Sequence, residues 1–312
     1  MSVHVIVGAG PVGSGTALLL ADAGHDVRVV TRSGSGPRHD RVELVRADAG
    51  DAAALRGATA GAATVYNCVN PRYHRWARDW PPMAAGLLAA AEHTGAGLVI
   101  MGNLYGYGEV DRPMTEDLPL AATSVKGRVR VAMWEDAMTA HRAGRVRVTE
   151  ARASDFFGPT VGTNTMIGTA FVPRILAGRA PYVLGRPDVP HTWSYLPDIT
   201  RALAVLGTDD RAWGRAWHVP SAPPESLRGL AGRVAEVAGV PEPTVRRIPE
   251  PVLRAIGLAV APMREFAEVR YQHDRPFVLD STAFTTTFGV EPTPMDDAVK
   301  ATVAWWRARS AA

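Results

Sequence analysis

The sequence contains a single cysteine, Cys68, among its 312 residues. One cysteine excludes a disulfide within the chain, which is typical of proteins in a reducing compartment, and we expect the cytoplasm. No apolar run approaches the ~20 residues that a membrane helix needs, so we expect no membrane span. The apolar start of the chain lacks a charged leader region, so we also expect no signal peptide.

Strong charge of one sign is also missing. The chain has 34 Lys and Arg against 31 Asp and Glu, a net charge of +3, and no basic run stands out. This pattern argues against a nucleic-acid partner. None of the nine histidines pairs at i, i+4 spacing with an acid between, so we predict no metal site. No Gly-x-Ser-x-Gly motif supports a serine nucleophile, and Cys68 is predicted to be a small core residue.

What the chain does have is a glycine turn near its start. The segment 3–21 is an apolar run, Val3–Val7, followed by a glycine-rich turn and a second apolar stretch. The first glycine allows a tight strand-to-helix turn, the second lets the backbone approach a pyrophosphate, and the third lets helix and strand pack closely. The free N–H groups of the following helix would bind the phosphates. We therefore predict a dinucleotide site formed by Gly8, Gly10, Pro11, Val12 and Gly13.

Strands and helices then alternate along the first half of the chain. Further strands are expected at 27–30, 42–45, 63–68, 98–101 and 145–151, with helices at 81–94 and 126–142. This rhythm predicts an α/β fold with a Rossmann-type, doubly wound parallel sheet. Beyond residue 160 the alternation breaks down. We therefore predict a dinucleotide-binding domain at 1–160 and a smaller, mainly helical C-terminal substrate lobe at 161–312, interleaved with the end of the sheet.

The end of the second strand indicates which dinucleotide binds. An acidic residue there would bind the adenosine 2′-OH, but Arg32 stands in that place. An arginine accommodates a 2′-phosphate, so we predict NADP as the cofactor and keep NAD as possible; a solvated arginine is the other interpretation. Asp48, a loop or capping residue, and Asn70, which follows the fourth strand, are further cofactor-binding candidates at the same edge.

Three segments rich in aromatic and polar side chains are expected to line a substrate pocket: 70–76, 105–107 and 191–195. The carboxyl edge of a doubly wound sheet and its seam with a second lobe are where such proteins bind ligands. Tyr107 and His191 are our candidate proton donors, and Tyr105 is a further candidate. The structural alternative is that these rings only pack the two lobes together.

The order of these landmarks resembles the extended and atypical short-chain dehydrogenase/reductases, the NAD-dependent epimerase/dehydratase family. The resemblance covers nearly the whole chain. It rests on the glycine turn and on motifs spread along the sequence, which are Leu104-Tyr105-Gly106, Pro113…Glu116…Pro119, Arg152…Phe157-Gly158-Pro159, His191–Asp198, Asp280-Ser281 and Phe288-Gly289…Pro292. The glycine turn is one residue tighter than the usual GxxGxxG of the family.

The resemblance implies a catalytic Ser or Thr and a Tyr-x-x-x-Lys motif, but this chain departs from all of these. The Ser position falls on Met101, the Tyr position on Lys126 and the Lys position on Arg130. If Lys126 is matched to the family's Lys instead, the Tyr position becomes Ala122. We expect Lys126, as a catalytic candidate, and Arg130, as a cofactor ligand, to face the cofactor as cations; the alternative is a pair of solvated charges.

The sequence thus predicts an NAD(P)-dependent oxidoreductase with a non-standard catalytic tetrad, acting on a small carbonyl- or hydroxyl-bearing metabolite. The alternative is a catalytically silent NADP(H)-binding redox sensor or scaffold protein, which loss of the tetrad favours. An epimerase or dehydratase with bound NAD is a third possibility within the enzyme class. The family resemblance also implies a homodimer through the helices near 82–94 and 126–142.

Overall fold

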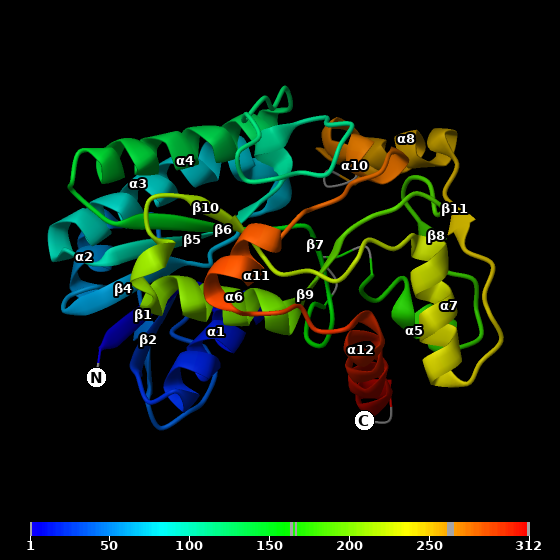
Figure 1. Cartoon of the computed structure of the whole chain (residues 1–312), viewed down its shortest axis with the longest axis horizontal. Coiled ribbons are helices and arrows are strands. Elements are labelled where there is room, and N and C mark those ends of the chain that lie inside the picture. The colour runs from blue at the N-terminus through cyan, green and yellow to red at the C-terminus, as the bar shows by residue number, and fades with distance from the viewer. Residues whose placement is uncertain (1, 163–164, 166, 261–264, 311–312) are drawn as a thin grey trace.

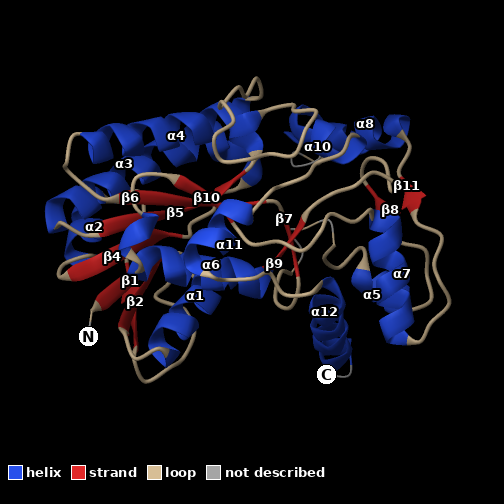
Figure 2. Ribbon diagram, viewed as in Figure 1, coloured by secondary structure: helices blue, strands red, loops and turns tan. Residues whose placement is uncertain are grey.

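A seven-stranded parallel sheet forms the centre of the computed structural model, which describes residues 2–162, 165, 167–260 and 265–310. The strand order is β10-β6-β5-β4-β1-β2-β3, and every pairing in the sheet is parallel (Figure 2). The strands are β1 Val3–Val7, β2 Asp26–Thr31, β3 Val42–Arg46, β4 Ala62–Asn67, β5 Gly97–Asn103, β6 Val148–Ala153 and β10 Ala216–His218.

Helices cover both faces of this sheet (Figure 1). One face carries α1 (Pro11–Asp22) and α6 (Leu196–Thr208), and the other carries α2 (Ala52–Ala58), α3 (Trp76–Thr94) and α4 (Val125–Arg142). A parallel sheet buried on both faces needs apolar side chains on both, which explains why the strands are continuous Val- and Ile-rich runs. The predicted doubly wound α/β fold is confirmed.

Helix α3 begins earlier than its sequence predicts. The Pro81-Pro82 pair was expected to open it, but the helix begins at Trp76 and both prolines lie inside it. Trp76 and Trp80 are both almost fully buried, with their rings 6.2 Å apart. Because Trp76 and Trp80 are one helical turn apart and share a face, burying both indoles stabilises a turn that proline alone disfavours.

The second lobe packs around its own core, from Phe157 to Trp306. Its helices and strands are α5 Val172–Leu176, α7 Leu227–Ala238, α8 Glu250–Ala259, α10 Tyr271–Asp274 and α12 Met295–Ser310, with β7 Asp155–Phe157, β8 Tyr182–Val183, β9 Trp193–Tyr195 and β11 Arg246–Arg247. Three segments from beyond residue 160, α6, β10 and α11 (Thr282–Phe288), return to the main sheet. The division at residue 160 stays a prediction.

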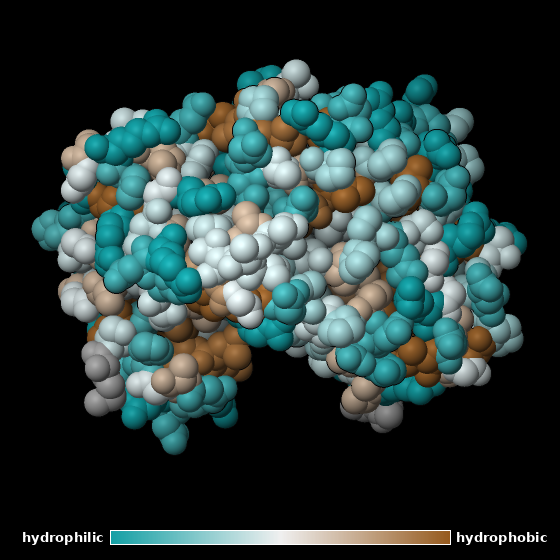
Figure 3. Space-filling model, in the orientation of Figure 1, coloured by the Kyte–Doolittle hydropathy of each residue, from teal (hydrophilic) through white to brown (hydrophobic). Residues whose placement is uncertain are grey.

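Hydrophilic residues cover most of the face shown in Figure 3, and hydrophobic ones form separate small patches. Among the helices that the structure describes, none has the length and apolar character required to cross a bilayer.

Candidate active site

The glycine turn between β1 and α1 meets the steric demands of a dinucleotide site. Gly8 has a φ of +105°, and a Cβ there would lie 2.6 Å from the carbonyl oxygen of Cys68. A Cβ on Gly13 would lie 1.9 Å from the carbonyl oxygen of Gly8, whereas one on Gly10 would meet no described atom within 4 Å. Gly8 and Gly13 therefore allow close contact between backbone segments. Gly10 borders the open space that a pyrophosphate requires.

The start of helix α1 is also suited to an anion. Pro11 occupies the first turn, and the N-cap residue Gly10 provides no side-chain cap. The first backbone N–H groups of the helix are therefore free to bind phosphate oxygens, assisted by the helix dipole. Val12, in the same turn, is buried and lines a cavity at the carboxyl edge of the sheet. These residues fit a dinucleotide cofactor.

The exposed end of β2 carries Arg32, followed by an exposed Ser33. The backbone carbonyl of Arg32 accepts a hydrogen bond from Nε of Arg46, 3.2 Å away, which ties this loop to the end of β3. Asp48 is exposed and accepts from the backbone N–H of Gly50 at 2.8 Å, so it closes a local turn. The cap of α2 comes instead from Asp51.

The cavity that Val12 lines has a volume of about 210 Å³ and lies at the carboxyl ends of β4, β5 and β6. Val12 reaches it from the glycine turn, and Asn70, Tyr73 and Trp76 reach it from the segment after β4. Tyr105 contributes from the turn after β5. The cavity thus joins the predicted cofactor turn to two of the three predicted aromatic segments.

Two tyrosines form a hydrogen-bonded pair at this cavity. The phenol oxygen of Tyr73 donates to that of Tyr105 over 3.3 Å. The indole of Trp76 packs against both rings, at centroid distances of 5.2 and 5.9 Å. Burial raises the pKa of both phenols above the usual value of 10.0. Both phenols therefore stay protonated at neutral pH. Because Tyr73 donates its hydrogen to Tyr105, the hydroxyl hydrogen of Tyr105 is the one available to a ligand.

Lys126 is buried beside this pair. Its Nζ lies 2.6 Å from carboxylate oxygens of both Glu265 and Glu268. The same ammonium lies 4.4 Å from the centroid of the Tyr73 ring. The solvated alternative for Lys126 is thus wrong, because its side chain is only 3% exposed. Lys126 is not among the residues that line the cavity; it packs against the ring of Tyr73, which is.

Arg130 lines the cavity from α4. Its guanidinium lies over the rings of Trp76 and Trp80, at 4.7 and 4.5 Å, and donates to the carbonyl oxygen of Met101 over 3.3 Å. Burial lowers the pKa of Arg130 to about 10, so it stays charged at neutral pH. Its Nε is buried and has no hydrogen-bond partner among the described residues. Arg130 therefore brings a cation to the cavity wall, with its unpaired Nε shielded from solvent.

Tyr107 does not reach the cavity. It is 1% exposed, donates to Nε2 of His218 and accepts from Arg152, both at 2.7 Å. Arg152 also pairs with Glu150 at 2.6 Å. Tyr107 therefore belongs to a buried polar network beneath the site, and this placement corrects the expectation that all of 105–107 faces substrate.

The segment 191–195 lies behind the cavity wall rather than in it. His191 is buried, and its Nε2 lies 3.0 Å from Oδ2 of Asp155. Asp155 lines the cavity, together with Gln272 and Phe277 from the second lobe. Asp155 and Gln272 were not among the sequence candidates. A carboxylate two residues after the end of β6, at the edge already expected to bind ligands, was the signal that could have found Asp155.

A larger cavity of about 350 Å³ lies between the sheet and helices α3 and α4. It is lined mainly by apolar residues such as Leu87, Ile100 and Met133, and by none of the predicted site residues. The chemistry-bearing groups therefore gather at the smaller cavity.

The sequence of the chain matches a model of the NAD dependent epimerase/dehydratase family over residues 4–219. The chain belongs to this family. Its members are enzymes, so the resemblance inferred from the sequence is confirmed. No curated protein matches the chain.

Solved structures of family enzymes share the fold over almost the whole chain. The dTDP-glucose 4,6-dehydratase of Bacillus anthracis, solved with NAD, has a TM-score of 0.82 at 15% identity, covering 100% of this chain and 98% of its own. The UDP-glucose 4-epimerase of Thermotoga maritima, solved with UDP-glucose, has a TM-score of 0.82 at 17% identity and 99% coverage of both chains. The dTDP-glucose 4,6-dehydratase of Streptomyces venezuelae has 0.79 at 21% identity, covering 99% and 98%.

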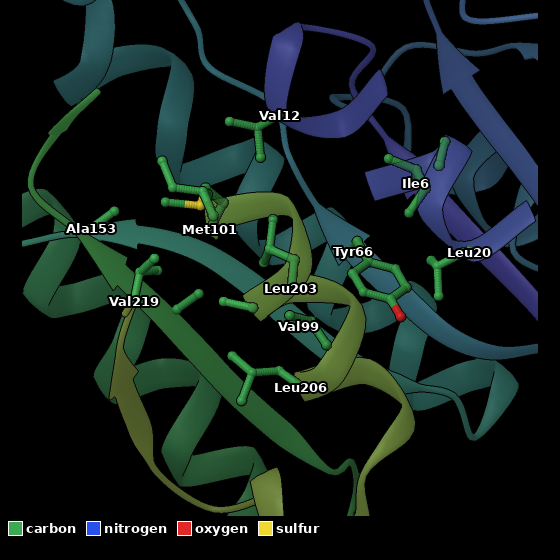
Figure 4. Close-up of a cluster of buried hydrophobic side chains, with 14 of the residues drawn as sticks. Ile6, Val12, Leu20, Tyr66, Val99, Met101, Ala153, Leu203, Leu206 and Val219 are labelled. Carbon is green, nitrogen blue, oxygen red and sulfur yellow. The ribbon is translucent and has the colours of Figure 1, made fainter. Parts of the chain in front are cut away.

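Met101, near the carboxyl end of β5, brings an apolar side chain to the cavity. Met101 lies in the buried part of β5, which continues to Gly102, and packs in the hydrophobic cluster with Ala153 and Leu203 (Figure 4). A thioether cannot donate a proton. Tyr73 and Tyr105 bring phenol groups to the same cavity, which Ser154 and Thr165 also line.

Proposed function

We propose that this family member is an NADP(H)-dependent oxidoreductase that reduces the carbonyl of a small metabolite. The observation that carries the proposal is the continuity of the glycine turn with a cavity whose wall bears the Tyr73–Tyr105 pair. When bound, the cofactor supplies the hydride. The protein supplies binding, orientation and a proton.

The cofactor would be held at both of its ends. Gly8, Gly10 and Gly13 with the start of α1 suit the pyrophosphate, and Arg32 at the end of β2 suits an adenosine 2′-phosphate. Arg130 lines the cavity as a cation and would bind ribose or carboxamide oxygens through its guanidinium, and Asn70 lies at the same edge. NAD, with which the Bacillus anthracis dehydratase was solved, stays a possible cofactor.

The protonated state of the phenols suits carbonyl reduction. Because burial raises the pKa of Tyr105 and Tyr73, neither provides a base at neutral pH. A protonated phenol can give its proton to the alkoxide that forms when a carbonyl accepts hydride. We therefore assign carbonyl reduction to this site, with Tyr105 as the proton donor and Tyr73 as its hydrogen-bond partner.

Lys126 would act as a positioning residue. Its ammonium makes a cation–π contact with the Tyr73 ring. Ion pairs with Glu265 and Glu268 of the second lobe fix the position of this ammonium. Glu268 also accepts from the backbone N–H of Val125 at 2.7 Å, so the same carboxylate holds the start of α4. His191 would act on the cavity only through Asp155.

The substrate class is the next part of the proposal. Family structures solved with UDP-glucose make nucleotide sugars one class to test, beside simple ketones and aldehydes. We also propose a cytoplasmic homodimer, in which α3 and α4 pack against the same helices of a second copy. Light scattering on the purified chain measures that mass directly.

The proposal is tested by following NADPH absorbance during incubation with pooled aldehydes, ketones and oxidised nucleotide sugars. We expect oxidation of NADPH that requires a carbonyl compound and slows in Tyr105→Phe. Tight NADPH binding with no turnover for any carbonyl class would instead support the sensor, which the loss of the family tetrad favours.

A further inference from the structure

Asp155, His191 and His273 converge from three segments that are far apart in the sequence. Asp155 begins β7, His191 lies just before β9, and His273 lies in α10. Nε2 of His191 and Nε2 of His273 lie 3.0 and 3.6 Å from the same oxygen, Oδ2 of Asp155. One ligand atom from each residue lies within 4.8 Å of the other two. Two imidazoles and one carboxylate form a common ligand set for zinc and other first-row metals.

The hydrogen bonding of His191 fixes which of its nitrogens faces Asp155 as an acceptor. Nδ1 lies 3.1 Å from the backbone carbonyl oxygen of Gln272, which can only accept, so Nδ1 carries a hydrogen. In the neutral ring, Nε2 then presents a lone pair toward a carboxylate oxygen 3.0 Å away. Oγ of Ser154 lies 3.5 Å from the same nitrogen, at the outer limit of a hydrogen bond. Two acceptors 3.0 Å apart therefore need either a proton or a metal ion between them.

The geometry favours a metal ion over a proton as that cation. Oδ2 of Asp155 is shielded from solvent, yet no donor among the described residues is aligned with it for a hydrogen bond. A proton on Nε2 of His191 would therefore point past the carboxylate. An ion ~2.1 Å from each of two ligand atoms at a tetrahedral angle separates them by ~3.4 Å. The observed 3.0 and 3.6 Å lie on either side of that separation.

The surrounding rings hold both imidazoles in place. His191 stacks on His273 with centroids 5.3 Å apart, and Phe266 stacks on His273 at 5.1 Å. Phe277 stacks on His191 at 5.3 Å. The carbonyl of Gln272 orients His191 in the way that outer-shell acceptors orient metal-binding imidazoles. Such support fixes the ligands before an ion arrives.

We propose that Asp155, His191 and His273 bind one divalent transition-metal ion of the Zn²⁺ type. Because Asp155 also lines the cavity, the ion would lie at the wall of the proposed substrate pocket. Binding of the ion does not depend on the proposed reaction, so the two proposals are tested separately. The predicted absence of a metal site rested on short sequence spacing, which cannot detect ligands brought together by the fold.

The test is metal binding by the full chain, after removal of any affinity tag and of metal with EDTA. Equilibrium dialysis against micromolar free Zn²⁺, followed by elemental analysis, should give one zinc per chain. Asp155→Asn and His273→Phe should weaken binding at least about 100-fold. The phenyl ring of His273→Phe retains the stack between Phe266 and His191. His93→Ala, which removes an exposed histidine, should bind as the wild type does.

Thermal unfolding supplies a second measurement, which does not depend on turnover. Zn²⁺ should raise the unfolding midpoint of the wild type and of His93→Ala, and leave that of His273→Phe unchanged. Near-ultraviolet circular dichroism shows whether each variant is folded. No zinc on the wild-type chain, or equal zinc on the wild type and a folded His273→Phe, would overturn the proposal.

Discussion

The phenol oxygens of Tyr73 and Tyr105 lie 3.3 Å apart at the wall of the cavity beside the glycine turn. Tyr73 comes from the segment after β4 and Tyr105 from the turn after β5. Met101 also borders the cavity but has no hydrogen to donate, and Lys126 does not line it. The pair brings two phenol groups to this wall.

Tyr105→Phe should lower kcat for carbonyl reduction by ~10²–10⁴-fold, because it removes a general acid. NADPH affinity should stay unchanged, since the ring and its contacts with Trp76 are retained. Stopped-flow measurement of NADPH oxidation, with a separate binding titration, gives both quantities. An unchanged kcat would exclude Tyr105 as the proton donor.

Tyr107→Phe is the matched control, because the same atom is removed two residues away but outside the cavity. It deletes the hydrogen bonds to His218 and Arg152, so the free energy of unfolding should fall by ~1–3 kcal/mol. Urea unfolding measures this loss. Turnover at a temperature where the variant is folded should match the wild type.

Arg32→Ala should reduce the affinity for NADPH by roughly tenfold to a hundredfold, since a charge-assisted contact is worth ~1.5–3 kcal/mol. The affinity for NADH should not change, because NADH lacks the 2′-phosphate. Fluorescence titration of both cofactors decides this, with the exposed Arg56→Ala as the control. Equal affinities for NADPH and NADH, unaltered by Arg32→Ala, would contradict the proposed role.

The variants Gly10→Ala and Gly13→Ala distinguish a loss of cofactor binding from a loss of backbone packing. A Cβ on Gly10 meets no described atom within 4 Å and its φ is −68°, so the variant should fold but bind NADPH at least about tenfold more weakly. A Cβ on Gly13 would lie 1.9 Å from a carbonyl oxygen, so Gly13→Ala should lose several kcal/mol of stability. Urea unfolding and NADPH titration of both variants measure the contrast; equal stability of the two would refute this account.

The free energy of unfolding should fall in mild acid because of the buried His4. Burial lowers its pKa to about 4, so between pH 6.5 and about 4 the unfolded chain binds a proton that the folded chain does not. Stability is therefore fully present above pH 6.5 and decreases as the pH falls through this window. From pH 7.5 to pH 5 the loss should be about 2 kcal/mol. Urea unfolding at both pH values should show a smaller difference in His4→Gln than in the wild type.

The fold was predictable because local signals and the global fold agree. Val3–Val7, the glycine turn and the repeated apolar strands each specify their elements with short-range chemistry alone. Helix α3 is the exception. Its extra turn depends on the burial of Trp76 and Trp80 against Arg130, a tertiary contact that no local pattern shows.

The site was only partly predictable, for a related reason. The carboxyl ends of parallel strands lie at the same edge of a sheet. The sequence could therefore predict that the segment 70–76 and Tyr105 lie near the cavity at that edge. Which face each side chain presents depends on packing, and Tyr107 turns toward His218 while Asp155 turns toward the cavity. The partners of Lys126 lie more than a hundred residues away in the second lobe, beyond the reach of sequence spacing.

The most direct test of the central claim is a crystal structure of the chain with NADPH. The account predicts the pyrophosphate at the start of α1, the 2′-phosphate at Arg32 and the nicotinamide ring in the cavity of about 210 Å³. The phenol oxygen of Tyr105 should border the space next to the ring that a carbonyl substrate would enter. A nicotinamide ring bound outside this cavity, or enclosed by packed side chains with neither Tyr73 nor Tyr105 beside it, would contradict the account.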